Sequence, residues 1–269
     1  MIPKTIHYCW FGGNPLPELA KKCIKSWKKY CPDYRIVEWN ESSFDVSAAP
    51  LYVRQAYEAK KWAFVSDYAR LRILYENGGI YFDTDVELVK SPEALLGYSA
   101  WFGFEDETHV NTGLGFGAEK GSPILADMLA DYQNIPFVLE DGSFDLTPCP
   151  VRNTEALVRH GLVCDNSRQL LPGNVAVFPT DWFRPLDYLT GVLQKTENTV
   201  SIHRYASSWY SEKEKAWFKR TSAKMKKELR HERYINGPKR LLRKLIGQER
   251  SERIKKLLGR GQTHHEKEE

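Results

Sequence analysis

The sequence predicts an α/β fold, in which helices cover a largely parallel sheet. The chain opens with a strand, a helix and a second strand at residues 5–11, 18–30 and 33–39. Its most regular stretch, residues 62–88, joins a helix to a short apolar strand. We find no internal repeat. An opening of this kind is the usual start of an α/β sheet whose ligands bind at the carboxyl ends of the strands.

The first strand brings Trp10 close to its carboxyl end, next to Gly12 and Gly13. Glycines permit a ligand to approach the backbone closely. From the residues alone, Trp10 fits a packed core position as well as the wall of a ligand pocket. His7 lies on the opposite face of the strand from Tyr8, and we expect it to be structural.

The helix that begins at Trp62 is expected to be amphipathic. Its apolar residues recur at three- and four-residue spacing, as expected for one face against a core: Ala63, Tyr68, Leu71, Leu74 and Tyr75. Asp67 and Arg70 are three residues apart and therefore share a face of the helix. Gly78 and Gly79 supply the positive φ that ends a helix at low cost.

Two carboxylates follow the apolar strand at residues 80–82. In a strand, residues two apart project to the same side, so Asp83 and Asp85 are expected to converge. Converging carboxylates repel each other and are costly to desolvate, but they suit a hard divalent cation. A lone D-x-D is more often a solvated turn. The apolar strand before it and the charged pair upstream favour the metal site.

The remaining pattern continues the α/β alternation. It predicts a short helix from Ser91, further helices at 122–132 and 153–160, and strands at 100–104, 175–178 and 199–203. Residues 111–118 read as a strand or loop with glycine at every second position, where a ligand could approach the backbone. No helix opens directly after these glycines, so they are not a phosphate-binding G-x-G-x-x-G loop.

Composition fits one globular domain with an extension. The 269 residues are 42% hydrophobic and 13% aromatic, which is sufficient for a large core. Five cysteines without a C-x-x-C pair indicate neither a zinc site nor a disulfide framework. We see no signal peptide and no apolar stretch approaching ~18 residues, so the sequence predicts a cytoplasmic protein.

Charge divides the chain near residue 210. Residues 211–269 contain 19 Lys and Arg against 9 Asp and Glu, a net charge of +10. Since the whole chain has a net charge of +4, residues 1–210 carry −6. We therefore predict a domain over residues 1–210 and a basic helical extension over 211–269. The acidic domain does not suggest a nucleic-acid partner.

The extension contains two apolar patches separated by Lys and Arg. They are Leu241, Leu242, Leu245 and Ile246, then Ile254, Leu257 and Leu258. This pattern is typical of a helix in a membrane interface, where attraction to anionic lipid contributes about 1 kcal/mol per basic residue. It favours a peripheral position at the inner face of the cell membrane. A solvated or self-associating helix explains the pattern nearly as well, so another subunit is an alternative partner.

Four stretches of the chain resemble family 32 of the glycosyltransferases, D-x-D sugar transferases that include capsule and exopolysaccharide synthesis enzymes. They are IPKTIHYCWFGG at 2–13, FVSDYARLRILYENGGIYFDTDVEL at 64–88, NTGLGFGAEKGSP at 111–123 and SIHRYASSW at 201–209. The resemblance spans nearly everything up to Tyr210. The chain departs from the family pattern at Arg204 and Tyr205, where an aromatic pair often follows the histidine.

The resemblance implies a GT-A-type, Rossmann-like fold and a hexosyltransferase activity. A sugar would pass from a nucleotide-diphosphate sugar, most simply a UDP-sugar, to a hydroxyl of a glycan or lipid-linked oligosaccharide. The anomeric configuration would be retained, in polysaccharide biosynthesis. No residue pattern marks a covalent nucleophile, which favours front-face substitution.

The resemblance also implies roles for individual residues. Asp83, Asp85 and His203 would hold Mn²⁺ or Mg²⁺, and the residues expected to be catalytic are Asp83, Asp85 and Asn111. From the residues alone, His203 could be structural and Asn111 a plain turn residue. The donor would lie against a larger set: Trp10, Asp67, Arg70, Tyr81, Asp83, Ser207 and Trp209.

Two other classes of function remain open. YFDTDVEL at 81–88 also matches an aspartyl-phosphate hydrolase signature, with Asp83 as nucleophile and Asp85 as acid. Those enzymes carry the motif on the first strand and need a later Lys and an acidic pair, and residues 181–187 are a poor match for the acidic pair. A non-catalytic nucleotide-sugar-binding protein is the other alternative, and it predicts tolerance of Asp85→Ala.

Overall fold

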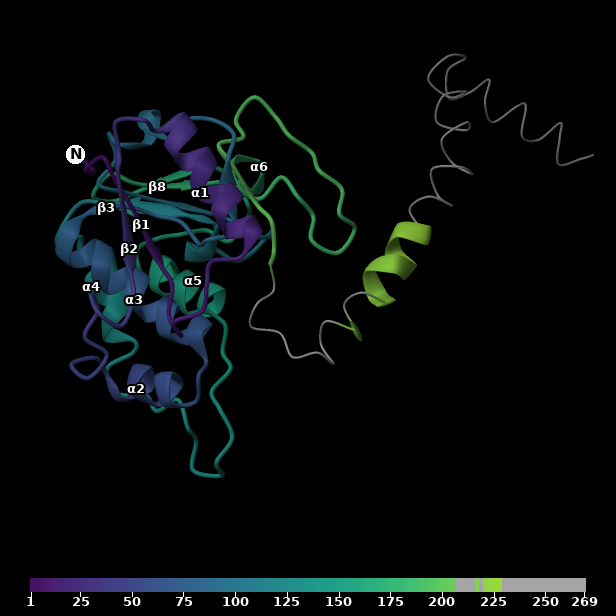
Figure 1. Ribbon diagram of the computed structural model, residues 1–269. Coiled ribbons are helices and arrows are strands. Elements are labelled where there is room, and N and C mark those ends of the chain that lie inside the picture. The colour runs from purple at the N-terminus through teal and green to yellow at the C-terminus, as the bar shows by residue number, and fades with distance from the viewer. Residues whose placement is uncertain (207–215, 218–219, 229–269) are drawn as a thin grey trace, which may run out of the picture. The chain divides into compact units, whose positions relative to one another are not determined.

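The computed structural model describes residues 1–206, 216–217 and 220–228 (Figure 1). The chain divides into two units, Met1–Tyr188 with Val192–Ser211 and Leu189–Gly191 with Glu212–Glu269. The predictions for Ser207, for Trp209, for the boundary at residue 210 and for the apolar patches of the extension lie outside the described residues. No helix within the described residues is long and apolar enough to cross a membrane.

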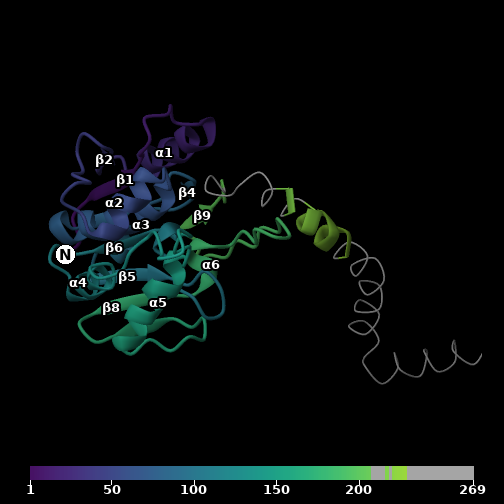
Figure 2. The ribbon, with the colours of Figure 1, turned by 90° about the horizontal axis from the view of Figure 1, so that it is seen from below.

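A seven-stranded sheet forms the centre of the first unit, in the order β2-β1-β3-β6-β5-β8-β7. Figure 2 labels β2, β1, β6, β5 and β8 in this sequence. Its strands are β1 Thr5–Cys9, β2 Arg35–Trp39, β3 Gly79–Tyr81, β5 Ala100–Gly103, β6 Phe116–Ala118, β7 Gln169–Leu171 and β8 Val175–Phe178. Strand β1 is parallel to β2 and β3, and β5 is parallel to β8. The antiparallel strand β6 joins the two groups. The predicted α/β class is confirmed, and the arrangement is consistent with a GT-A-like fold.

A second sheet consists of two short antiparallel strands, β4 Val86–Leu88 and β9 Ser201–His203. Val86 lies directly opposite His203 in this pairing. Because Asp85 immediately precedes β4, the pairing brings the end of β9 to the D-x-D motif across more than a hundred residues of sequence.

Helices cover both faces of the large sheet (Figure 1). They are α1 Glu18–Tyr30, α2 Leu51–Glu58, α3 Trp62–Asn77, α4 Pro123–Ala130, α5 Cys149–Arg159 and α6 Thr180–Phe183. Helices α2 to α5 share one apolar core with the sheet, and α1 and α6 share a second core on the other face. Tyr81 belongs to the first core, while Ile80 and Phe82 belong to the second. This alternation follows from the pleat of an extended chain.

Helix α3 is buried more deeply than the sequence pattern indicates. The prediction of an amphipathic helix is wrong, because only Arg72, Glu76 and Asn77 of its residues are exposed. The helix contacts both the sheet and the neighbouring helices α2 and α4, so nearly its whole circumference is covered. Its end is as predicted: Gly78 has φ 66° and its N–H donates to the Leu74 carbonyl at 2.7 Å.

The glycines of residues 111–118 serve the packing of the protein itself. This stretch contains a short 3-10 helix, Thr112–Leu114, followed by β6. A Cβ at Gly115 would lie 2.5 Å from the ring of Phe82, and one at Gly117 would collide with Trp101. At these two positions the space is filled by aromatic side chains, so the expectation of ligand approach is wrong there. Helix α2, strands β4 and β7 and the short helix α6 are additions that the sequence pattern did not predict.

Candidate active site

A cavity of about 830 Å³ lies at the carboxyl ends of β1, β3 and β5. This is the edge of the sheet at which α/β folds bind ligands. Seven of the predicted site residues line it: Trp10, Asp67, Arg70, Asp83, Asp85, Asn111 and His203. Tyr81 is only 1% exposed and does not line the cavity, but its hydroxyl donates to Asp83 Oδ1 at 2.9 Å.

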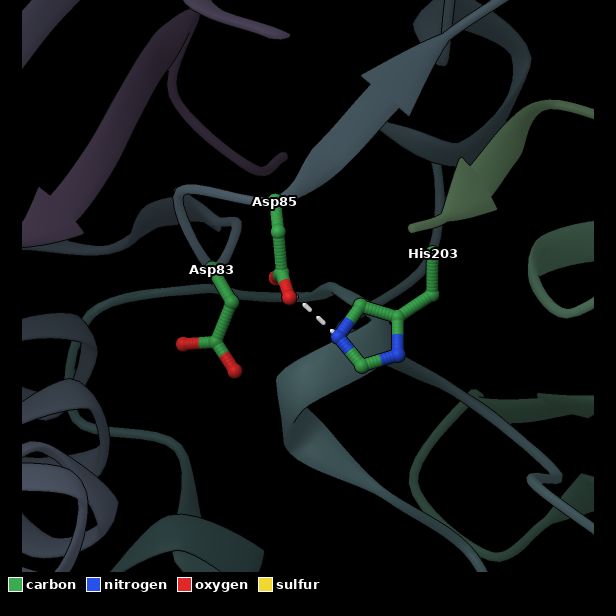
Figure 3. Close-up of side chains that lie close together, drawn as sticks. All are labelled: Asp83, Asp85 and His203. Atoms are coloured by element: carbon green, nitrogen blue, oxygen red, sulfur yellow. Dashed lines mark ion pairs between the residues drawn. The ribbon is translucent and has the colours of Figure 1, made fainter. Parts of the chain in front are cut away.

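Asp83, Asp85 and His203 form a cluster of metal-ligand type (Figure 3). One potential ligand atom from each residue lies within 4.8 Å of the other two. The D-x-D motif occupies the turn between β3 and β4, which the Val86 N–H closes by donating to the Asp83 carbonyl at 3.0 Å. The prediction that the motif lies in an extended strand is therefore wrong. The carboxylates converge because of the turn and not by strand alternation.

Asp85 is held in place from two directions. Its Oδ1 lies 3.1 Å from His203 Nε2, and its Oδ2 accepts the N–H of Ala206 at 2.7 Å. Burial opposes ionisation of this carboxyl group, but His203 and the Ala206 N–H outweigh it and lower the pKa of Asp85. Burial likewise opposes protonation of His203, and the charges of Asp85 and Asp83 overcome it and raise the pKa of His203.

The residues of this cluster fit a divalent cation. Carboxylate oxygens suit Mg²⁺ and Mn²⁺, and an imidazole nitrogen can complete the shell of a transition metal. The proximity of Asp85 contributes, after burial, to a raised pKa of Asp83, which is the repulsion that a cation would relieve. Nδ1 of His203 is buried without a hydrogen-bond partner among the described residues. Nε2, however, faces Asp85 and therefore the cluster.

Arg70 connects the buried carboxylate of Asp67 to the half-buried Asp83 of the cluster. Its Nη2 lies 2.9 Å from Asp67 Oδ1 and 3.2 Å from Asp83 Oδ1, so the helix pair and the D-x-D motif form one network. Its Nε donates to the Ser66 carbonyl at 3.1 Å, and its guanidinium lies over the ring of Tyr81. Burial raises the pKa of Asp67 to about 6, against the opposing effect of Arg70. The shared face predicted for Asp67 and Arg70 is confirmed.

Asn111 is fixed by contacts that the sequence did not reveal. Its Oδ1 accepts the N–H of Gly113 at 2.6 Å and the thiol of Cys149 at 3.5 Å. Cys149 is the first residue of α5, and its Sγ lies 4.0 Å from Arg70 Nη1. Burial raises the pKa of Cys149, so the thiol stays a neutral donor. Since Cys149 belongs to no recognisable motif, only the fold shows that it reaches the site.

Trp10 is half-buried and also lines the cavity. Its Nε1 donates to the Asn14 carbonyl at 2.5 Å, which fixes the ring against the loop after β1. The structure thus places Trp10 in the wall of the cavity as well as against the core on the α1 face.

The wall of the cavity also contains residues that the sequence interpretation missed. They are Lys60, Lys61, Glu105, Asp106, His109, Arg184, Tyr188 and Tyr205. Tyr205 packs its ring against His203 at 4.2 Å and accepts a hydrogen bond from Arg184 Nε at 3.1 Å. These residues come from separate loops, and no spacing in the sequence connects them.

Comparison with known proteins gives one family match and one curated relative of note. Residues 17–101 match the family described as a glycosyltransferase sugar-binding region containing a DXD motif. Over 140 residues the chain is 31% identical to inositol phosphoceramide mannosyltransferase 3 of Schizosaccharomyces pombe (strain 972 / ATCC 24843). That match covers 51% of this chain and 38% of the relative, so the chain spans less than half the length of the S. pombe protein.

Two solved structures show partial similarity. PaToxG glycosyltransferase has a TM-score of 0.47 at 23% identity, over 59% of this chain and 69% of that one. A glycosyltransferase involved in glycosylation of the major capsid of PBCV-1 has a TM-score of 0.41 at 13% identity, over 76% and 94%. The family match and the curated relative together support a glycosyltransferase.

Proposed function

We propose that this protein is a metal-dependent glycosyltransferase that moves a sugar from a nucleotide-diphosphate sugar to a hydroxyl acceptor, with retention of configuration. One observation carries the proposal. Asp83, Asp85 and His203 meet in a cavity at the carboxyl end of the sheet, within and beside a stretch that matches a DXD sugar-binding region. Arg70 ties this cluster to Asp67 on helix α3.

Each residue has a role in this proposal. Asp85 and His203, with Asp83, hold Mn²⁺ or Mg²⁺, which when bound supplies neutralisation of the charge on a departing diphosphate. Asp67 and Arg70 orient the donor's sugar and ribose, and Trp10 lines the pocket of the base. The remaining proposed contacts to the donor and sugar are Asn111, Ser207 and Trp209, and Tyr81 acts through its hydrogen bond to Asp83.

The acceptor in this proposal is a glycan or a lipid-linked oligosaccharide in polysaccharide or capsule assembly. The name of the S. pombe relative contains a lipid acceptor, inositol phosphoceramide, and mannosyl transfer. This supports a hydroxyl on a lipid-linked group as acceptor, and it adds GDP-mannose to the UDP-sugars as a donor to test. A basic extension that binds anionic lipid at the inner face of the membrane would suit such an acceptor.

The aspartyl-phosphate hydrolase alternative receives no support from the geometry. A nucleophilic carboxylate needs a free oxygen directed at the substrate. Asp83 Oδ1 is engaged by both Arg70 and Tyr81, so this oxygen is not free. The motif also follows the third strand in the chain and not the first.

The test is a screen of UDP- and GDP-sugars for release of the nucleoside diphosphate. We expect release that chelator abolishes and that Mn²⁺ or Mg²⁺ restores. Asp85→Asn should lower the rate by about 100-fold or more, while the melting temperature stays near that of the wild type. Asp127→Asn, an exposed carboxylate on α4, is the control and should keep full activity. Full turnover in excess chelator, or a wild-type rate in Asp85→Asn, would remove the metal from the proposal. A non-catalytic binding protein would release nothing from any donor.

A further inference from the structure

Among the described residues, five carboxylates line the cavity, and four of them have partners. Asp67 and Asp83 contact Arg70, Asp85 contacts His203, and Asp106 contacts His109. The fifth is Glu105, which is half-buried. Its carboxylate has no hydrogen-bond or ion-pair partner among the residues that the structure describes. An ionised carboxylate accepts hydrogen bonds and donates none. A ligand that binds in the cavity beside Glu105 would therefore pair with it through hydrogen-bond donor groups.

The order of the strands places Glu105 away from the end of the cavity assigned to the base. Trp10 follows β1 and the D-x-D motif follows β3, whereas Glu105 follows β5. In the sheet, β3 lies between β1 and β5. Along this edge of the sheet, the metal-ligand cluster therefore lies between Trp10 and Glu105.

Glu105 and the cluster lie in the wall of the same cavity. Tyr205, another residue of this wall, packs its ring against His203 at 4.2 Å. A donor's diphosphate belongs with the cluster and Arg70, and an unpaired carboxylate would repel it. The donor's charged part therefore does not supply the partner that Glu105 needs.

The loop that carries Glu105 is held in a defined shape. An antiparallel bridge between Phe104 and Val110 closes it, and the Glu105 N–H donates to the His109 carbonyl at 2.7 Å. Asp106 Oδ1 accepts the N–H groups of Thr108 and His109, both at 2.8 Å. Side chains on a preorganised loop lose little freedom when they bind, so the loop suits recognition.

We infer that Glu105 binds hydroxyl groups of the acceptor, and that the acceptor is a carbohydrate or polyol that is uncharged where it enters this end of the cavity. The inference rests on the proposed function. Two oxygens of one carboxylate can accept from neighbouring hydroxyls of a sugar or inositol ring through charge-assisted bonds. The same negative charge disfavours an acceptor with an acidic group at that position. Glu105 is thus a specificity residue for the acceptor.

The test compares Glu105→Gln with Glu107→Gln. Glu107 lies on the same loop, is exposed, does not line the cavity and accepts a bond from Asn166, so it is a matched control. The donor is the nucleotide sugar that the wild type cleaves. The acceptor probes are myo-inositol and the methyl glycosides of mannose, glucose and glucuronic acid. The readouts are the acceptor KM, the preference between glucoside and glucuronide, and donor affinity by calorimetry.

In Glu105→Gln we expect the KM for neutral acceptors to rise by about tenfold, and the preference for glucoside over glucuronide to fall by a similar factor. Donor affinity and melting temperature should stay close to wild type, and Glu107→Gln should change none of these. Three results would overturn this inference and leave the proposed function standing. They are an unchanged acceptor KM in Glu105→Gln, the same change of KM in Glu107→Gln, and a loss of donor affinity in Glu105→Gln as large as the rise in acceptor KM. Failure of the wild type to transfer to any of the neutral probes would do the same. A wild type that cleaves no nucleotide sugar would overturn the proposed function, and the inference with it.

Discussion

Arg70 determines whether the buried charges of the site are stable. Its side chain is only 4% exposed, and one nitrogen contacts both Asp67 and Asp83. The flat guanidinium also donates to the Ser66 carbonyl and reaches Thr112 at 3.5 Å. A buried carboxylate that loses its partner is costly. Arg70 therefore has a structural role and, in the proposed function, a donor-binding role, and a substitution can separate the two.

We expect Arg70→Lys to be poorly tolerated, because an ammonium cannot reproduce the contacts of the planar group. Stability should fall by roughly 1–3 kcal/mol, and donor affinity by about tenfold or more. Thermal unfolding measures the first effect and calorimetry with the donor the second. Unchanged donor affinity with a lowered melting temperature would show that the pair is purely structural.

His7 is the second buried residue whose charge state matters. It is 1% exposed, its Nε2 donates to the Gly78 carbonyl at 3.1 Å, and its Nδ1 accepts from Trp39 Nε1 at 2.9 Å. Only the neutral ring can make both bonds, since protonation would put a hydrogen on Nδ1 facing another donor. Burial lowers the pKa of His7 to about 4. The expectation of a structural residue agrees with these contacts.

This depressed pKa predicts a loss of stability in acid. The unfolded chain takes up the proton near pH 6.5 and the folded one only near pH 4, so His7 stabilises the fold above pH 6.5 and progressively less as the pH falls. The shift corresponds to about 3 kcal/mol. Urea unfolding at pH 7 and pH 4 should therefore show a steeper decline in the wild type than in His7→Gln. Parallel declines would contradict this assignment.

At the scale of elements, the site depends on how closely the turn after β3 approaches the short 3-10 helix that precedes β6. Gly113 lies between them: a Cβ there would be 2.6 Å from Asp83 Oδ2 and 2.9 Å from Asn111 Oδ1. The absence of a side chain at this position leaves the Asp83 carboxylate where it can join Asp85 and His203.

We expect Gly113→Ala to displace the Asp83 carboxylate and to weaken Mn²⁺ binding by about tenfold or more. The fold should survive, because the group that must move is a side chain at a cavity wall. Electron paramagnetic resonance or calorimetry with Mn²⁺ measures the affinity. Gly97→Ala, where a Cβ meets nothing within 4 Å, is the control. Wild-type Mn²⁺ affinity in Gly113→Ala would exclude Asp83 from the metal site.

The whole chain combines an acidic segment with a basic one. Residues 1–210 carry −6 and residues 211–269 carry +10. Such asymmetry favours an anionic surface as the partner of the extension and not of the domain. Attraction to anionic lipid of about 1 kcal/mol per basic residue would be additive over several of them.

We expect the full chain to sediment with anionic liposomes at low salt, and a chain truncated at Ser211 to remain in the supernatant. High salt should release the full chain, because screening weakens the attraction. Truncation should slow transfer to a lipid-linked acceptor more than cleavage of the donor in solution. If both chains sediment equally, self-association becomes the better explanation of the extension.

Local pattern was sufficient for the main features of the fold. The strand–helix–strand opening, the helix end at Gly78 and the strand Val175–Phe178 follow from residue spacing and glycine chemistry, which act between near neighbours. The shared face of Asp67 and Arg70 follows from the helix period. The pattern failed for α3, whose burial on most sides depends on helices that pack around it.

The sequence by itself predicted the candidate site residues: the D-x-D carboxylates, the Asp67–Arg70 pair and, through the family resemblance, the histidine at residue 203. Only the tertiary structure decided how they meet. Pairing of β4 with β9 brings His203 to Asp85, and the turn between β3 and β4 brings the carboxylates of Asp83 and Asp85 together. The tertiary structure also decided that Cys149 contacts Asn111 and that Glu105 lies in the cavity without a partner among the described residues. The reason is physical: periodicity and turn chemistry are local, whereas the cavity is built where strand order brings distant loops to one edge of the sheet.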